Sequence, residues 1–250
     1  MTLQQLMGYM RRAIDDYQMI QEGDKIAIGI SGGKDSISMA LALRGLQDYY
    51  PKHFELEAFT VSLGFPEFDV TGIRELMNRY DIPYSLIETD IGKIVFEDRR
   101  EKNPCSLCAK LRKGSFNKYA AAHGCNKVAL GHHTEDVVET FYLSLFYEGR
   151  LHTFSPVTQW DRSGLVAIRP MIYVKEADII SFARREQLPI VKNPCPADGN
   201  TQREIMKNQI REWNRQFGHN TERTFKAIQD GLPDWEVLSP SSIRRRKGDQ

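Results

Sequence analysis

Strand-like and helix-like segments alternate along most of this 250-residue chain, and that alternation limits its fold more than any other feature. Short apolar runs predict strands, and apolar residues three or four apart predict helices. Because a helix between two strands usually joins them in parallel, we predict an α/β fold, a parallel sheet with helices on both faces. The predicted strands are 25–30, 54–63, 84–88, 127–130 and 165–168. The predicted helices are 3–20, 37–46, 69–80, 109–122, 135–147, 175–186 and 200–217.

Composition excludes several other classes of protein. Hydrophobic residues make up 41% of the chain and charged residues 27%, which is typical of a folded globular protein and not of a disordered one. No apolar run reaches the ~18 residues that span a bilayer, and the N-terminus does not resemble a secretory signal. We therefore expect a cytoplasmic protein without a membrane partner. Four cysteines are too few for a disulfide scaffold, so their spacing favours metal or redox chemistry.

Positive charge is concentrated in two segments, although the net charge is only +1. Residues 99–118 carry seven basic side chains and one acidic side chain, and residues 239–250 carry four basic and one acidic. Basic patches on an otherwise acidic chain indicate a polyanionic partner. Two solvated loops would have the same composition.

The first chemical motif follows the predicted strand 25–30. Its residues are Ser31, Gly32, Gly33, Lys34, Asp35 and Ser36. Glycines let backbone amides approach phosphate oxygens, a helix N-terminus favours an anion, and Lys34 adds positive charge. A nucleoside triphosphatase P-loop would have glycine in place of Ile28 and a hydroxyl residue in place of Asp35. The carboxylate of Asp35 would repel a γ-phosphate unless a Mg²⁺ ion bridged the two groups. The motif resembles instead the PP-loop of ATP pyrophosphatases, which cleave ATP between the α- and β-phosphates. A glycine-rich turn capped by Ser36 is the alternative.

The second motif, residues 130–136, reads LGHHTED and again lies between a predicted strand and a predicted helix. Because ligands of open α/β sheets lie beyond the carboxyl ends of the strands, we expect Asp136 to face the first motif. PP-loop enzymes that modify tRNA have a similar Gly-His-His/Asn-x-x-Asp segment, whose aspartate is associated with the nucleotide and its Mg²⁺. Asp136 could instead only complement the helix dipole, and His132 and His133 could be structural.

The cysteines form a third motif. Cys105 and Cys108 are three residues apart, whereas Cys125 and Cys195 stand alone. A closed zinc site usually takes a second such pair, but an iron–sulfur cluster can be held by three cysteines. Cys195, which has a proline on each side, is the natural third ligand. Cys125 directly precedes a predicted strand, and we expect it to be a small buried hydrophobe.

Together the segments PCSLCAKLRKG and VALGHHTEDVVETFYLSLFYEG and the PP-loop resemble the tRNA 2-thiocytidine synthetase (TtcA-type) family, over roughly residues 24–213. Members use ATP to activate the C2 oxygen of an anticodon-loop cytidine, position 32 of the tRNA, and replace it with sulfur. A [4Fe–4S] cluster held by three cysteines takes part. The resemblance implies the fold of the adenine nucleotide alpha hydrolases (N-type ATP pyrophosphatases), with ATP and Mg²⁺ as cofactors. It also implies tRNA and an external sulfur donor, sulfide or a cysteine desulfurase, as partners.

The resemblance also assigns roles to individual residues. The cluster would be held by Cys105, Cys108 and Cys195. ATP would be bound by Ser31, Gly32, Gly33, Lys34, Asp35, Ser36, Gly131, His132 and Asp136. Mg²⁺ would be held by Asp35 and Asp136. The catalytic residues would be Lys34, Asp35, Asp136 and the three cluster cysteines. The side chains that contact tRNA phosphates would be Lys110, Arg112, Lys113 and Lys118.

Several alternatives stay open. Asp198 stands where family members commonly have a further cysteine. The fourth iron of the cluster could be ligated by Asp198, by a water or by a sulfide. The chain could be a PP-loop enzyme for another base, of the 2-thiouridine or lysidine type, or a non-catalytic metal-containing RNA-binding module. The resemblance implies a homodimer, for which the amphipathic helix 3–20 is a candidate interface, although a core helix has the same pattern. The expected organisation is an N-terminal helix (1–22), a PP-loop domain (23–192) with an inserted cysteine segment (99–118), a C-terminal ligand loop with helices (193–238) and a basic tail (239–250).

Overall fold

The computed structural model describes residues 1–65, 68–99, 104–191 and 202–238. These residues contain one six-stranded sheet with the order β3-β2-β1-β4-β6-β5. The strands are β1 (Asp24–Gly29), β2 (Phe54–Val61), β3 (Tyr84–Ile87), β4 (Lys127–Ala129), β5 (Val157–Trp160) and β6 (Leu165–Ile168). All neighbours pair in parallel except β5, which runs antiparallel to β6. The predicted α/β class is confirmed, and the five predicted strands are present.

Most helices of the described residues lie where the apolar spacing predicts them. They are α1 (Leu3–Asp16), α2 (Lys34–Gln47), α3 (Thr71–Arg79), α4 (Ile91–Lys93), α5 (Pro104–Ala122), α6 (Thr134–Leu143), α7 (Glu176–Arg185), α8 (Gln202–Phe217) and α9 (Asn220–Gly231). Short π-helical turns, η1 (Ile94–Asp98) and η2 (Ser144–Glu148), extend α4 and α6, and a 3-10 turn, η3 (Pro233–Trp235), follows α9. The short α4 and the helix α9 were not predicted.

One helix boundary differs in a way that matters for the site. The sequence predicts a basic loop before residue 109, but α5 already begins at Pro104, so Cys105 and Cys108 lie in its first two turns. Proline is favoured at the start of a helix because it has no backbone N–H to leave unpaired. Leu107 and Leu111 then pack against a small core around Leu63, Ile91 and Val95, which stabilises the early turns.

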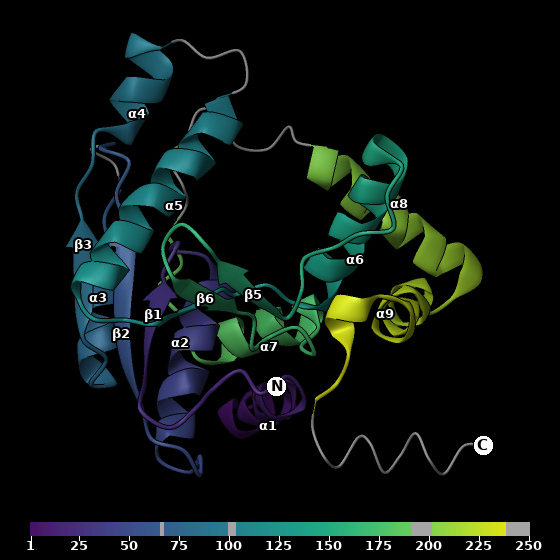
Figure 1. Cartoon of the computed structure of the whole chain (residues 1–250), viewed down its shortest axis with the longest axis horizontal. Coiled ribbons are helices and arrows are strands. Elements are labelled where there is room, and N and C mark those ends of the chain that lie inside the picture. The colour runs from purple at the N-terminus through teal and green to yellow at the C-terminus, as the bar shows by residue number, and fades with distance from the viewer. Residues whose placement is uncertain (66–67, 100–103, 192–201, 239–250) are drawn as a thin grey trace.

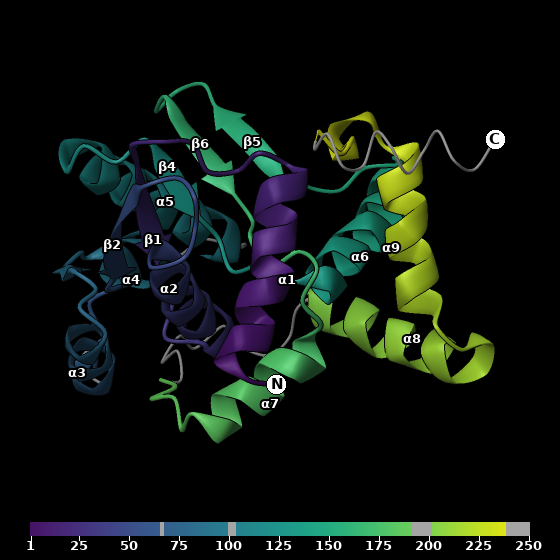
Figure 2. The same ribbon diagram turned by 90° about the horizontal axis from the view of Figure 1, so that it is seen from below.

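Helices cover both faces of the sheet, as predicted (Figure 1). Ile26 and Ile28 of β1 belong to the main core with α1, α2, α3 and α7, whereas Ala27 faces a second core with α5. This alternation is the two-residue period of a strand buried on both faces. The apolar side of α1 is buried in the main core of its own chain, and Figure 2 shows α1 against α2 and α7.

A second group of helices, α6, α8 and α9, stands at the opposite side of the molecule from α3, α4 and α5 (Figure 1). Aromatic contacts hold this group together, including Tyr142 of α6 against Trp213 of α8, with ring centroids 5.0 Å apart. Trp235 is fully buried and packs edge-on against Tyr17 and Phe225, which ties the end of the described chain to α1 and α9. None of the helices in the described residues combines the length and the apolar composition needed to cross a membrane.

A buried ion pair joins β1 and β4, the two strands that carry the chemical motifs. The ammonium of Lys127 lies 2.7 Å from Asp24 Oδ2 and donates to the Met19 carbonyl at 2.7 Å. Asn126 donates to the other oxygen of Asp24 at 2.8 Å. The strand pair is therefore fixed at its amino end by a hydrogen-bonded charge pair.

We predict that Lys127→Ala lowers the free energy of unfolding by about 3 kcal/mol, because removing one partner of a buried ion pair leaves the other charge uncompensated. The control is Lys226→Ala, which removes an exposed pair with Asp230 and should cost less than about 0.5 kcal/mol. Urea unfolding followed by circular dichroism measures both values. Equal losses in the two variants would contradict the prediction.

Candidate active site

The first motif forms a tight turn between the carboxyl end of β1 and the start of α2. The Ser31 amide donates to Ser36 Oγ at 3.1 Å, and the Ser36 hydroxyl lies 3.1 Å from the Gly33 carbonyl, to which it donates. Gly32 has a φ of +86°, which favours glycine, and its carbonyl accepts a hydrogen bond from the Val191 amide at 3.0 Å. No side chain of the described residues caps α2 at Gly33. The amides of the first turn of α2 can therefore bind an anion.

Lys34 and Asp35 open α2 and face each other. The Lys34 ammonium lies 3.1 Å from both carboxylate oxygens of Asp35 and 3.3 Å from Glu176 Oε1. Burial disfavours the charged ammonium, but Asp35 and Glu176 outweigh it and raise the pKa of Lys34. Buried Asp35 Oδ1 accepts no hydrogen bond from the described part of the chain. A charged lysine beside a carboxylate oxygen that accepts no hydrogen bond from the described residues fits a site for a phosphate and its metal ion.

Gly131 brings the second motif into direct contact with the first. A Cβ atom on Gly131 would lie 3.2 Å from both the Asp35 carbonyl carbon and the Ser36 amide nitrogen. Parallel pairing of β1 with β4, with Ile28 opposite Ala129, places the two loops at the same edge of the sheet. The two motifs therefore form one site, as expected for the carboxyl ends of neighbouring parallel strands.

His132, predicted to bind the nucleotide, lies next to this contact. Its ring stacks on Phe154 with centroids 4.6 Å apart. Burial, together with the charge of Arg169, lowers the pKa of His132 to about 4, so its imidazole is neutral at pH 7. His132 cannot then offset phosphate charge. Its buried Nδ1 has no hydrogen-bond partner among the described residues, which leaves that atom available to a ligand.

Asp136 has structural partners in addition to its predicted role. Its Oδ2 accepts a hydrogen bond from the His133 amide at 3.0 Å and so caps α6. Its Oδ1 lies 3.3 Å from the Arg203 guanidinium of α8. Burial works against the charged form of His133, but Glu135 and Asp136 outweigh it and raise the pKa of that imidazole. The metal-binding role of Asp136 stays a prediction.

Four charged residues of the site were not identified from the sequence. Arg203 also lies 3.3 Å from Glu139 of α6, whose pKa is raised to about 7 by burial and by the neighbouring Asp136. Glu176, the first residue of α7, pairs with both Lys34 and Lys207 of α8. The spacing of Arg203 and Lys207 places them on one face of α8 and is visible in the sequence, but their carboxylate partners are not.

The cysteine pair is connected to the first motif through α5. Cys105 is exposed, and Cys108 packs at the edge of the small core around Val95. Arg112, one helical turn after Cys108, lines a small pocket together with Ser31 and two aromatic rings, Phe65 and Phe68. Cys195 lies outside the described residues, and within the described residues no three potential ligands form a metal site. Cys125 is buried, as predicted, and burial raises the pKa of its thiol to about 11.

The basic residues of α5 do not share one environment. Arg112 faces the pocket beside Ser31, whereas the Lys113 ammonium lies 3.8 Å from the ring centroid of Trp160. Partial burial lowers the pKa of Lys113, and Arg169 adds to the effect. Lys113 is exposed despite its contact with Trp160, and so are the remaining two side chains, Lys110 and Lys118. The three lysines are therefore accessible to a large polyanion, whereas Arg112 is partly buried.

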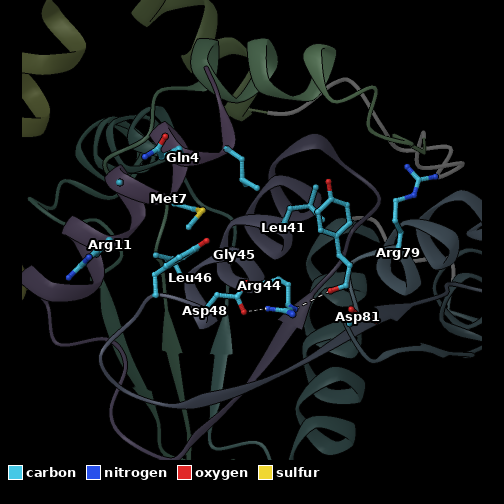
Figure 3. Close-up of a pocket in the computed structure, with 14 residues that line it drawn as sticks. Gln4, Met7, Arg11, Leu41, Arg44, Gly45, Leu46, Asp48, Arg79 and Asp81 are labelled. Atoms are coloured by element: carbon cyan, nitrogen blue, oxygen red, sulfur yellow. Dashed lines mark hydrogen bonds and ion pairs between the residues drawn. The ribbon is translucent and has the colours of Figure 1, made fainter.

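A larger pocket of about 910 Å³ lies elsewhere, between α1, α2 and the end of α3 (Figure 3). Met7 of α1 points into it, and Arg44 donates to Asp48 and to the Tyr80 carbonyl across it. Arg44 is ten residues after Lys34 along α2, a separation of about 15 Å. This pocket contains none of the motif residues.

We predict that Gly131→Ala separates the two motifs, because its methyl group would press on backbone atoms that cannot rotate away. The free energy of unfolding should fall by about 1–3 kcal/mol, the usual range for overpacking. Gly8→Ala is the control: its Cβ meets nothing within 4 Å in α1, and alanine favours a helix. Thermal unfolding of the two variants measures the difference, and a Gly131→Ala protein as stable as wild type would contradict the close contact.

Comparison with known proteins agrees with this geometry. Residues 6–213 match the family model of the PP-loop domain. The tRNA-cytidine(32) 2-sulfurtransferase of Dichelobacter nodosus is 38% identical over 250 residues, covering 98% of this chain and 92% of the relative. The enzyme of the same name from Alcanivorax borkumensis is 40% identical over 224 residues, covering 89% of this chain and 79% of the relative.

Solved structures show the same fold at lower identity. The U34-tRNA thiolase NcsA from Methanococcus maripaludis, solved with its [4Fe-4S] cluster, superposes with a TM-score of 0.70 and 21% identity, covering 90% of this chain and 78% of that chain. The NH3-dependent NAD synthetase of Campylobacter jejuni superposes with a TM-score of 0.51 and 14% identity, covering 96% of this chain and 100% of that one. The motifs, their contact and these matches agree: the chain belongs to the PP-loop family and, within it, to the tRNA-cytidine(32) 2-sulfurtransferases.

Proposed function

We propose that this protein is an ATP-dependent tRNA thiolase. It adenylates the C2 oxygen of an anticodon-loop cytidine, at position 32 of the tRNA, and then replaces that oxygen with sulfur. The observation that carries the proposal is the backbone contact of Gly131 with Asp35 and Ser36, because it joins both family motifs in one site. Relatives named as sulfurtransferases for this cytidine match nearly the whole chain and support the same substrate.

Binding of ATP is assigned to the first motif and its surroundings. The open amides at the start of α2 and the Lys34 ammonium bind phosphate oxygens. Asp35 and Asp136 supply carboxylate oxygens for Mg²⁺, and Asp35 Oδ1, which accepts no hydrogen bond from the described residues, fits that role.

In the first step the base oxygen attacks the α-phosphorus, and the bond to the β-phosphate oxygen breaks. Pyrophosphate leaves with the electron pair, and the base becomes adenylated. Lys34 and the amides of α2 stabilise the negative charge that develops on the leaving group. His132 is neutral at pH 7, so we assign it a hydrogen bond to the nucleotide and no part in charge neutralisation.

In the second step sulfur at the oxidation level of sulfide attacks C2 of the base, the bond between C2 and the adenylated oxygen breaks, and AMP leaves with that oxygen and the electron pair. Cys105, Cys108 and Cys195 would hold the [4Fe–4S] cluster. With three protein ligands such a cluster supplies one iron that is open to a further ligand. Cys105 and Cys108 fit because they lie one helical turn apart on the same face of α5. The Val191 amide is hydrogen-bonded to the Gly32 carbonyl of the first motif. Cys195 is four residues further along the chain, and four extended residues span at most about 14 Å from Val191.

The partners follow from the same assignment. Exposed Lys110 and Lys118 on α5 would contact tRNA phosphates near the cysteines, and binding would weaken with salt. Arg112 and Lys113 would join them once tRNA displaces their present contacts with the pocket and with Trp160. The sulfur would come from an external donor, sulfide or a cysteine desulfurase, and the active form would be a homodimer.

We predict that Cys105→Ala abolishes both the cluster and tRNA thiolation. Cys105 is exposed, so its loss should leave the fold intact. Cys125→Ala is the matched control, because Cys125 is buried away from the pair and should keep both properties. Visible absorbance of anaerobically purified protein reports the cluster, and mass spectrometry of nucleosides from complemented cells reports 2-thiocytidine. Full thiolation by Cys105→Ala would overturn the cluster assignment.

We predict that Lys34→Ala lowers the rate of tRNA-dependent pyrophosphate release at least tenfold, because the leaving group loses a positive charge. The visible absorbance of the cluster should not change in this variant. Lys226→Ala on α9 removes a lysine remote from the site and is the control. Unchanged pyrophosphate release from Lys34→Ala would remove the PP-loop assignment.

A further inference from the structure

One carboxylate oxygen in the site is shared by two lysines from different parts of the chain. Glu176 Oε1 accepts hydrogen bonds from the Lys34 ammonium at 3.3 Å and from the Lys207 ammonium at 2.7 Å. Lys34 belongs to the first motif, Glu176 opens α7, and Lys207 lies on α8. The same charge-assisted hydrogen bonds that lysines make to a carboxylate oxygen they also make to a phosphate oxygen.

Glu176 is held in this place as a charged group. Its side chain is 16% exposed, and burial would raise its pKa, but Lys207 and Lys34 outweigh burial and lower the pKa to about 2. Its backbone amide donates to Glu135 Oε2 of the second motif at 2.9 Å. The carboxylate therefore carries its full negative charge at pH 7, and the backbone of Glu176 is anchored by the second motif.

The surrounding charges make this carboxylate a competitor for any incoming polyphosphate. Besides Glu176, the acidic side chains around Lys34 and α6 are Asp35, Glu135, Asp136 and Glu139. The cations facing them are Lys34, Lys207 and Arg203, with His133 as a further partner. A polyphosphate can reach Lys34 only if it takes the place of a carboxylate oxygen there. Glu176 can be displaced because it reaches Lys34 with a side chain from another helix.

We propose that Glu176 occupies the position of a phosphate oxygen in the ligand-free site, and that Lys207 is a second phosphate-binding residue beside Lys34. This inference rests on the proposed ATP site and adds a subsite for the β- and γ-phosphates, which leave as pyrophosphate. On binding, the phosphate oxygen accepts from both ammonium groups, and the Glu176 carboxylate turns away from them. Lys207 then neutralises charge on the leaving group from α8, opposite to the first motif.

A purely structural role would give a different result. If the pair of Glu176 and Lys207 only braces α7 against α8, loss of either side chain weakens the site in the same direction. If Glu176 stands in for phosphate, its removal strengthens phosphate binding, whereas removal of Lys207 weakens it. The sign of the Glu176 effect therefore separates the two roles.

The test uses calorimetric titration of the full-length protein with inorganic pyrophosphate and, separately, with AMP, both with Mg²⁺. Lys207→Ala should weaken pyrophosphate binding about tenfold or more, the usual effect of losing a hydrogen bond to a charged group. Glu176→Gln should tighten pyrophosphate binding severalfold. Both variants should bind AMP within about twofold of wild type, because AMP has no phosphate for this subsite. Lys226→Ala should match wild type with both ligands.

Three outcomes would overturn the proposal. The first is a pyrophosphate affinity that does not change in Lys207→Ala, and the second is a pyrophosphate affinity that falls in Glu176→Gln. The third is an equal loss of affinity for AMP and for pyrophosphate in Lys207→Ala. If Lys207→Ala melts earlier than wild type, Lys207→Arg serves as the second variant and should restore pyrophosphate binding and leave AMP binding unchanged. A wild-type protein that binds neither ATP nor pyrophosphate would overturn the proposed function itself, which is a different result from loss of the Lys207 effect alone.

Discussion

The approach of Gly131 to the peptide between Asp35 and Ser36 is the contact on which the rest of the site depends. It exists because β1 and β4 are parallel neighbours in register, so both strands end at the same level and lead directly into their loops. Only a residue without a side chain lets two backbones come so close. Once α2 and α6 start side by side, the charged residues of their first turns must either repel each other or share cations supplied by other helices.

In this structure the acidic residues share cations supplied by other helices. Arg203 of α8 pairs with Asp136 of α6, and Lys207 of α8 pairs with Glu176 of α7. Lys34 of α2 forms a further ion pair with Glu176. Glu139 is buried beside Asp136, and the burial raises its pKa to about 7, which is a cost of this crowding. Because the charged side chains are already paired, a charged ligand binds by replacing one member of an ion pair. The charged groups are then in place before the reaction, which needs little further reorganisation of the site. Such a site favours a ligand that brings several charges of its own, as a polyphosphate with a divalent cation does.

The sequence predicts those parts of the structure that depend on local pattern. Strand β1, the turn after it and the placement of Asp136 at a helix start all follow from short segments with strong apolar or glycine signals. Strand β5 was missed because VTQW has no apolar run and is a partly exposed edge strand fixed by its hairpin partner. The early start of α5 was missed because its charges suggested a loop, whereas tertiary packing of Leu107 decides the outcome. Glu176 was missed because its partner Lys34 is 142 residues away in the sequence.

The position of the cysteines on a helix restricts which substrate the proposed reaction can use. Near the start of α5, Cys105 and Cys108 are fixed relative to each other, with Cβ atoms about 5–6 Å apart. Leu107 and Leu111 fix that turn to the body of the protein, and Arg112 connects it to the pocket beside Ser31. Rigid elements therefore set the distance between the thiols and the phosphate-binding loop. A base that must meet both has to leave its stack and enter the space between them, which costs a few kcal/mol less in a single-stranded loop than in a duplex. Under the proposed mechanism, an anticodon loop is therefore a less costly substrate than a paired region of a tRNA.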